Sequence, residues 1–344
     1  MCLNLIAGPK SRSHLGYKQV VLAHLARSKM DVDWLPEDLH LYNESTIELP
    51  LELLEIVFHL AAAECRRFCY SLCSVSTWGR TIALRHLLVS LIIKGPESNF
   101  FAVQIVAGNI LHRPSHLIPS DLIQNIWMPY TADSLVFLFD SCKNLKNLAT
   151  DWRSFDHLVE AACGRHPWRV LSDAALWQEQ NLSLLIFTTT DISSARLSQV
   201  QMIESRFASN LGPSKFPIFS RITHLRLMPL ISYYHQLHFP LLTCLTHLAL
   251  PYHDYSISQG QCDWLLESPT AKIKMLVIMI FTDILSDTQQ AQAMSGIRKW
   301  RKMNNRLYGY STSLDTEKEW LEGTKGGESI WEGAVRYTEQ NREL

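Results

Sequence analysis

The spacing of apolar residues changes along the chain, and this change is the main guide to its organisation. Between residues 50 and 88, apolar side chains recur every three to four positions, as they do on amphipathic helices. From about residue 88 onward, short apolar runs alternate with helical stretches, which is typical of α/β structure. The sequence therefore predicts an α+β protein: a small all-helical module followed by a larger α/β region.

The first helix of the module is expected to begin at Pro50. Proline suits a first helical turn, because the backbone N–H that it lacks would have no partner there. One broad face of this helix is apolar and carries Leu53, Leu54, Val57, Phe58, Leu60 and Ala61. A second helix is expected from about Glu64 and a third over Thr81–Leu88.

The α/β region contains seven short apolar runs that read as strands. They are Leu88–Ile93, Leu122–Met128, Leu145–Ala149, Leu182–Phe187, Ile222–Leu227, Leu245–Leu250 and Ile273–Ile280. Between or after these runs, helices are expected over Asp133–Cys142, Phe155–Cys163, Ser194–Ser205, Cys262–Leu266 and Gln289–Lys302. A further amphipathic helix is expected within Ser329–Leu344.

Two of the predicted strands repeat one another. Thr223-His224-Leu225-Arg226-Leu227 recurs 23 positions later as Thr246-His247-Leu248-Ala249-Leu250, and a Phe-Pro pair precedes each copy. This period lies within the range that is typical of leucine-rich repeats, whose strands also carry a Leu-x-Leu pattern. The strands before Ile222 are spaced more widely than this range allows, so the array is expected to be irregular.

Stacking of such repeats would place equivalent residues side by side. His224 and His247 occupy the same position of the repeated strand and should stack on one face of the sheet. The candidate substrate-binding face consists of His224, Arg226, His247 and Ala249. The alternate positions, Leu225, Leu227, Leu248 and Leu250, should belong to the core.

Composition excludes some classes of function and narrows the compartment. The 344 residues include 32 basic and 33 acidic side chains, a net charge of −1, so no excess of positive charge favours binding to nucleic acid. No apolar run is long enough for a membrane span. The eight cysteines show no Cys-x-x-Cys spacing and no export signal precedes them, which indicates reduced thiols in the cytoplasm or nucleus.

The first 47 residues are interpreted as a helix and a linker. Residues 17 to 29 read as a basic helix, and the segment from Asp31 to Glu48 is polar and interrupted. An organelle transit peptide is also poor in acidic residues, but a basic helix leading into a linker explains the pattern more simply.

Residues with catalytic or metal-binding potential form no recognised signature. Nucleophile elbows, phosphate loops and His-Glu-x-x-His zinc motifs are missing from the sequence. Cys65, Cys69 and Cys73 follow helical spacing, which favours packing of small apolar thiols over a zinc site. An unrecognised enzyme site would use His235 or His238 with Asp254. We expect no catalytic residue, no metal and no cofactor.

The start of the helical module resembles a known family. The family pattern of the first F-box helix, LPxELLxxIF, is matched by Leu49-Pro50-x-Glu52-Leu53-Leu54-x-x-Val57-Phe58. Further on, Val75-Ser76-Thr77-Trp78 resembles the family's Val-Ser-x-x-Trp, with the tryptophan one residue early. The inserted segment Ala61–Arg67 resembles the expanded F-box proteins of mushroom-forming fungi, which often continue into irregular leucine-rich repeats.

This resemblance implies both a partner and a division of the chain. Residues 1–47 would be the helix and linker, 48–94 the F-box-like module, 95–310 an irregular leucine-rich-repeat solenoid, and 311–344 a tail or cap. In the family, the F-box binds the Skp-type adaptor of a cullin–RING ubiquitin ligase. The residues that would bind this adaptor are Leu49, Pro50, Leu53, Leu54, Val57, Phe58, Leu72 and Val75.

The expected function is therefore that of a non-enzymatic adaptor for protein degradation. The F-box would bind the Skp-type adaptor, and the repeats would bind an unidentified protein substrate across an extended surface. The alternative is a protein-interaction scaffold with a vestigial F-box. Nucleic acid and membranes are not expected partners.

Overall fold

The computed structural model divides the chain into two compact units, residues 1–87 and residues 88–344. The structure describes residues 50–106, 119–130, 132–162, 164, 171–172, 181–187, 217–228, 242–252, 259–267 and 272–341. The predictions for Leu49, the helix at 17–29 and the helix at Ser194–Ser205 lie outside these residues.

The described part of the first unit, from residue 50 onward, contains three helices: α2 (Leu51–Glu64), α3 (Arg66–Val75) and α4 (Thr77–Leu88). Their small core is built around Phe58, whose ring lies 5.9 Å from that of Phe68 and 5.4 Å from that of Trp78. Cys69 and Leu72 complete this core from α3. Helix α2 begins one residue after the predicted start, and Pro50 is its N-cap residue.

The second unit is built on one sheet of eight parallel strands, and each strand lies beside the strand that precedes it along the chain. The strands are β1 (Ser90–Ile92), β2 (Asn125–Met128), β3 (Asn147–Asp151), β4 (Leu182–Phe187), β5 (Ile222–Leu227), β6 (His247–Pro251), β7 (Met275–Phe281) and β8 (Leu307–Thr312). All seven predicted strands are confirmed within a few residues. A mixed α/β protein with a parallel sheet is therefore shown.

The register of the paired strands places equivalent side chains beside one another across the sheet. A row of aliphatic residues crosses the whole sheet through Leu91, Ile126, Leu148, Leu184, Leu225, Leu248, Leu276 and Leu307. Except for Leu91, every member of this row is at most 2% exposed. Parallel strands with both faces covered need such continuous apolar burial.

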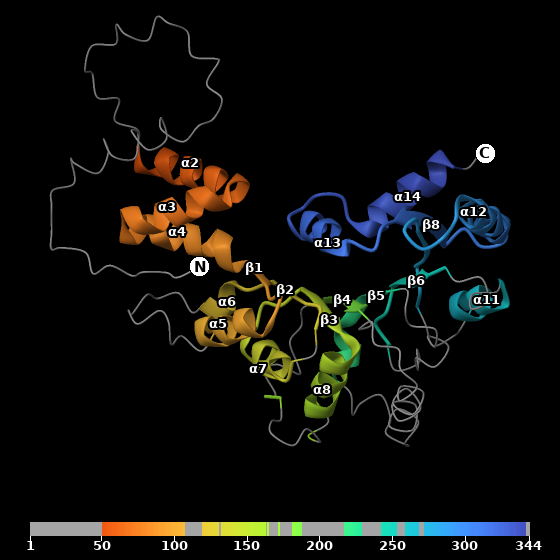
Figure 1. Ribbon diagram of the computed structural model, residues 1–344, viewed down its shortest axis with the longest axis horizontal. Coiled ribbons are helices and arrows are strands. Elements are labelled where there is room, and N and C mark those ends of the chain that lie inside the picture. Colours follow the sequence, from red (N-terminus) through yellow and green to blue (C-terminus); the bar gives the residue numbers. More distant parts are fainter. Residues whose placement is uncertain are drawn as a thin grey trace, which may run out of the picture. The chain divides into compact units, whose positions relative to one another are not determined.

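Helices lie on both sides of the sheet. Those that the structure describes between strands are α5 (Pro96–Val106), α6 (Pro119–Leu122), α7 (Ser134–Ser141), α8 (Trp152–Ala162), α11 (Gln259–Glu267) and α12 (Asp287–Arg301), together with the short 3₁₀ turn η4 (Pro217–Arg221). Two further helices, α13 (Thr316–Thr324) and α14 (Ile330–Gln340), follow β8. Figure 1 shows α5, α7 and α8 on one side of the strands and α13 and α14 on the other.

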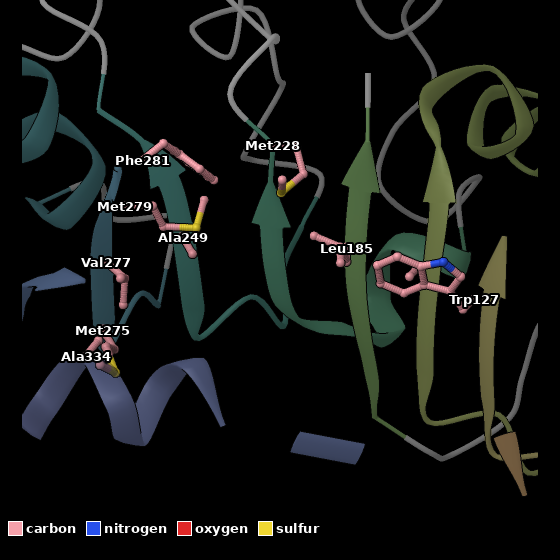
Figure 2. Packing of buried hydrophobic residues seen from close by; sticks show 10 residues of the cluster. Trp127, Leu185, Met228, Ala249, Met275, Val277, Met279, Phe281 and Ala334 are labelled. Atoms are coloured by element: carbon pink, nitrogen blue, oxygen red, sulfur yellow. The ribbon is translucent and has the colours of Figure 1, made fainter. Parts of the chain in front are cut away.

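The sheet face toward α13 and α14, here called the α13/α14 face, carries its own apolar cluster. Its buried members are Trp127, Ala149, Leu185, Met228, Ala249, Met275, Val277, Met279 and Phe281 of the sheet region, and Ala334 of α14 (Figure 2). Trp320, Ile330 and Trp331 from the two helices pack against this cluster. The C-terminal helices are therefore part of the packing of the second unit.

α14 also protects the outer edge of the sheet. Strand β8 is an edge strand, and an edge strand offers unpaired backbone groups to other chains. Thr338 of α14 satisfies two of these groups: its Oγ1 accepts a hydrogen bond from Gly309 N (2.9 Å) and donates one to Gly309 O (3.1 Å). The close approach is possible because residue 333 is glycine, where an added Cβ would lie 2.8 Å from Tyr310 Cε2.

Two predicted boundaries differ from the structure. Residues 88–94 lie with the sheet, because β1 pairs with β2, so the helical unit ends near Leu87 rather than at residue 94. Strand β8 crosses the predicted boundary between residues 310 and 311. This strand has the sequence Leu-Tyr-Gly-Tyr-Ser-Thr, with a single aliphatic residue, so it resembled the start of a polar tail.

Candidate interaction surfaces

Helix α2 exposes an apolar surface on the side opposite to its packed side. Phe58 and Ala62 are at most 5% exposed and face the module core, whereas Leu53, Ile56, Val57 and Leu60 are 47%, 54%, 48% and 63% exposed. At about 100° per residue, these four side chains fall within an arc of about 100°. We call them the α2 stripe.

The predicted adaptor-binding residues fall into two groups. Pro50, Leu53 and Val57 are exposed, and Leu54 and Val75 are half-buried. Phe58 and Leu72, by contrast, are 5% and 2% exposed and lie inside the module core.

Sequence reasoning did not select Ile56 as a partner-binding residue, and it placed Leu60 on the same broad face as Phe58 without selecting it. Their exposure follows from the direction in which α2 packs. The sequence of a helix that is apolar on both sides does not reveal this direction.

The predicted substrate face is a real face of the sheet, but other parts of the chain cover it. His224 pairs with His247 and Arg226 with Ala249 across β5 and β6, so the repeated pentapeptides are in register, as predicted. The alternate residues Leu225, Leu227, Leu248 and Leu250 are at most 2% exposed, which confirms their assignment to the core. Arg226 and Ala249 are 5% and 0% exposed, because α13 and α14 lie over this face.

The two histidines stack as the repeat predicts. Their ring centroids lie 4.2 Å apart with an interplanar angle of 14°, and Trp331 of α14 lies 5.3 Å from each ring. Each Nδ1 lies within hydrogen-bond distance of the preceding threonine hydroxyl, 2.9 Å for Thr223 and 2.8 Å for Thr246.

Burial keeps this histidine pair uncharged. It lowers the pKa of His224 to about 4, with a further contribution from His247. Burial also lowers the pKa of His247, with a smaller contribution from the Lys274 charge. A neutral, stacked pair packs beneath an indole, so this geometry supports a packing role.

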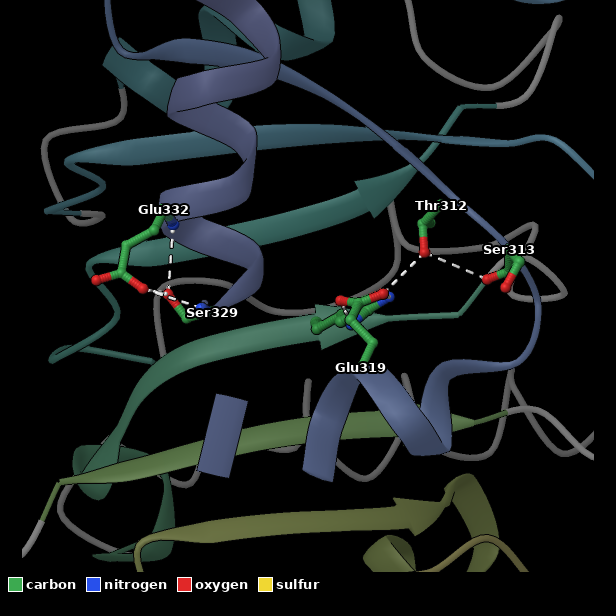
Figure 3. Close-up of polar contacts among 6 residues, drawn as sticks. Thr312, Ser313, Glu319, Ser329 and Glu332 are labelled. Atoms are coloured by element: carbon green, nitrogen blue, oxygen red, sulfur yellow. Dashed lines mark hydrogen bonds and ion pairs between the residues drawn. The ribbon is translucent and has the colours of Figure 1, made fainter. Parts of the chain in front are cut away.

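Arg226 forms a largely buried ion pair with Glu319. Its Nη1 lies 2.6 Å from Glu319 Oε1 and its Nη2 lies 3.3 Å from Glu319 Oε2, a bidentate arrangement. Thr312 of β8 donates a hydrogen bond to the same carboxylate at 2.8 Å (Figure 3). The side chains of Arg226 and Glu319 are only 6% and 19% exposed.

The remaining chemical candidates have structural explanations or lie outside the described residues. Cys69 is buried and its Sγ lies 3.2 Å from Ala62 O, while Cys65 is exposed and precedes α3, so the three cysteines share no site. Within the described ranges, no group of three or more His, Cys, Asp or Glu residues could hold a metal ion. His235, His238 and Asp254 lie outside the described residues.

No helix among the described residues is long and apolar enough to cross a membrane.

Comparison with known proteins adds no relative: no family model matches this chain, and neither the curated proteins nor the solved structures contain a match.

Proposed function

We propose that this protein is a substrate-recognition adaptor of a Skp–cullin–F-box ubiquitin ligase, with the helical unit as its F-box and the sheet unit as its substrate-binding part. The observation that carries the proposal is the α2 stripe. It lies on the helix whose sequence resembles the first F-box helix, and it leaves four large apolar side chains in solvent.

The stripe has the geometry of a helix-in-groove contact. Such contacts use apolar anchors at spacings of three, four and seven residues, and Leu53, Ile56, Val57 and Leu60 provide all three spacings. Transferring a Leu, Ile or Val side chain from water into a groove contributes about 1.5–3 kcal/mol when burial is complete. A partner that covers the stripe is therefore favoured over continued exposure.

The sheet unit supports the second half of the proposal. Eight parallel strands in sequential order, with equivalent residues in register, are the arrangement expected of an irregular leucine-rich-repeat solenoid. In such an array, a protein partner binds the strand face opposite the inter-strand helices, and here α13 and α14 lie over that face. A cytoplasmic or nuclear location and the lack of enzymatic activity belong to the same proposal.

Co-expression with the Skp-type adaptor of the host tests the proposal. The Leu53→Asp, Val57→Asp double variant places two charges in the stripe and should abolish a complex that the wild-type chain forms. Because both positions are about half exposed, the variant should keep its fold. The matched control is Ser71→Asp, Ser74→Asp, which adds the same charge at exposed positions of α3 and should leave the complex intact.

A second candidate function is a protein-interaction scaffold with a vestigial F-box. It is favoured by the burial of Phe58 and Leu72, which leaves fewer of the predicted anchors available to an adaptor. A folded wild-type chain that forms no adaptor complex would establish this alternative over the first.

A further inference from the structure

Helix α13 lies across the sheet in the place where the proposed function expects a protein substrate. Three side chains from one short run of α13, Glu317, Glu319 and Trp320, reach residues of the sheet region. Glu317 reaches Lys94, which follows β1, at 2.6 Å, and the Trp320 ring lies 5.2 Å from that of Trp127 on β2. Glu319 reaches Arg226 on β5. The run therefore touches strands from one side of the sheet to its middle.

The sheet side of these contacts is a built site for a carboxylate. Arg226 is 5% exposed, and a buried guanidinium without an anionic partner is costly. Thr312 directs its hydroxyl at the same carboxylate that the guanidinium binds. Even with Glu319 bound, Arg226 Nε remains buried without a hydrogen-bond partner in the structure. The face thus requires an acid at this position, whichever segment supplies it.

The two C-terminal helices are held in different ways. Among the residues of α14, Gly333, Ala334 and Thr338 are buried, and Thr338 is bonded to the backbone of β8. In α13, only Thr316 is buried, and the contacts with the sheet are made by charged and aromatic side chains that stay partly exposed. α14 is therefore an integral part of the unit, whereas α13 lies on the sheet much as a bound peptide would.

We propose that the α13/α14 face binds a helical protein segment with the sequence acid-x-acid-Trp, and that α13, with Glu317-Lys318-Glu319-Trp320, occupies this site as the chain's own competing ligand. The incoming acids pair with Arg226 and Lys94, and the incoming indole packs on Trp127, as Glu319, Glu317 and Trp320 do here. Assigning the incoming segment to a recruited substrate rests on the proposed function; the binding site itself does not.

Because α13 competes for the site within the same chain, it weakens the binding of an external segment to the α13/α14 face. The apparent affinity for an external segment falls by the fraction of molecules in which α13 has left the face. Removing the anchors of α13 should therefore increase that affinity, whereas removing Arg226 should decrease it.

The test uses a fluorescein-labelled synthetic peptide of residues 313–325 and the full-length chain, with binding followed by fluorescence anisotropy. The Glu319→Ala, Trp320→Ala double variant should bind the peptide at least about tenfold more tightly than the wild-type chain. Adding Arg226→Ala to that variant should abolish the gain. The control peptide carries Gln at positions 317 and 319 and Ala at position 320, and it should not bind.

The proposal is overturned if the double variant keeps the wild-type circular dichroism spectrum and still fails to bind the peptide. It is overturned equally if Arg226→Ala leaves the binding unchanged. The assay contains no adaptor protein, so its outcome is independent of the co-expression experiment.

A second measurement applies to the wild-type chain and does not depend on the variant's folding. In native-state hydrogen exchange, the amides of α13 should exchange at least about tenfold faster than those of β8 and α14, because α13 leaves the face without unfolding of the sheet. Exchange of α13 as slow as that of β8 would show a permanent structural element and overturn the proposal.

Discussion

At the scale of single residues, burial decides which chemical groups remain reactive. It raises the pKa of the Cys142 and Cys262 thiols to about 12, with smaller contributions from the neighbouring charges of Asp121 and Asp263. These thiols stay protonated near neutral pH and behave as small apolar groups. The stacked His224 and His247 are likewise held in their uncharged form, which makes folding stability sensitive to acid.

The sign of this pH dependence follows from the lowered pKa. An unfolded histidine titrates near pH 6.5, whereas folded His224 titrates at about 4. The unfolded state therefore binds more protons between these values, and the His224 contribution, fully present above pH 6.5, is lost as the pH falls toward 4.

We expect His224→Gln to show a shallower acid dependence than the wild-type chain. Between pH 7 and pH 4.5, the unfolding free energy of the wild-type chain should fall by about 1–2 kcal/mol more than that of the variant. The value is this small because the His224 ring is partly exposed. Urea titrations at several pH values, compared between the two proteins, measure it. Parallel curves would show that His224 is not buried in its neutral form.

At the scale of elements, the turn between α13 and α14 depends on glycine. Gly326 adopts a φ of +84°, a conformation in which other L-residues are strained. Gly327 follows, and an added Cβ there would lie 2.8 Å from Glu322 O. Gly323 differs from both, since it lies inside α13 and an added Cβ would meet only ordinary contacts at 3.6 Å or more.

This difference predicts opposite effects of the same substitution. Gly326→Ala should lower the free energy of unfolding by about 1–2 kcal/mol, because it forces a side chain into a left-handed conformation. Gly323→Ala is the matched control and should raise it by roughly 0.5–1 kcal/mol, through the higher helix propensity of alanine. Equilibrium urea unfolding of the two variants distinguishes the cases. Equal effects of the two substitutions would contradict the turn geometry.

At the scale of the whole molecule, the sheet unit needs its C-terminal segment. Parallel strands are buried on both faces, and the inter-strand helices α5, α7 and α8 lie on one side of this sheet. α13 and α14 cover the other, and α14 also satisfies backbone groups of the β8 edge. The region predicted from sequence as a tail or cap thus completes the sheet unit.

A chain that ends after Ser313 should expose the apolar cluster of the α13/α14 face. Trp127, Leu185 and Met275, now at most 7% exposed, would meet solvent. We expect strong binding of the dye 1-anilinonaphthalene-8-sulfonate and a loss of at least about 3 kcal/mol in unfolding free energy.

The control for this truncation is a chain that ends after Asn341, which keeps both helices and should behave as the wild type. Weak dye binding by the shorter chain, with an unchanged urea midpoint, would show that the two helices do not protect the sheet.

The sequence alone determined the seven strands from β1 to β7, the three helices described over residues 51–88 and the stacking of His224 on His247. These features depend on local apolar periodicity and on a repeated pentapeptide, and both can be recognised in a single sequence. Strand β8 and helix α13 were not predicted, because polar residues interrupt their apolar positions. Their buried sides are recognisable only from the strands and helices that pack against them.

Only the tertiary structure decided which surfaces remain open. Helix α2 is apolar on two sides, and the packing of Phe58 against Phe68 and Trp78 selects which side stays exposed. Likewise, the partner of Arg226 lies 93 positions away in the chain, at Glu319. A contact over such a distance has no local signal in a single sequence, because it arises when the sheet, the turn and the last two helices are assembled.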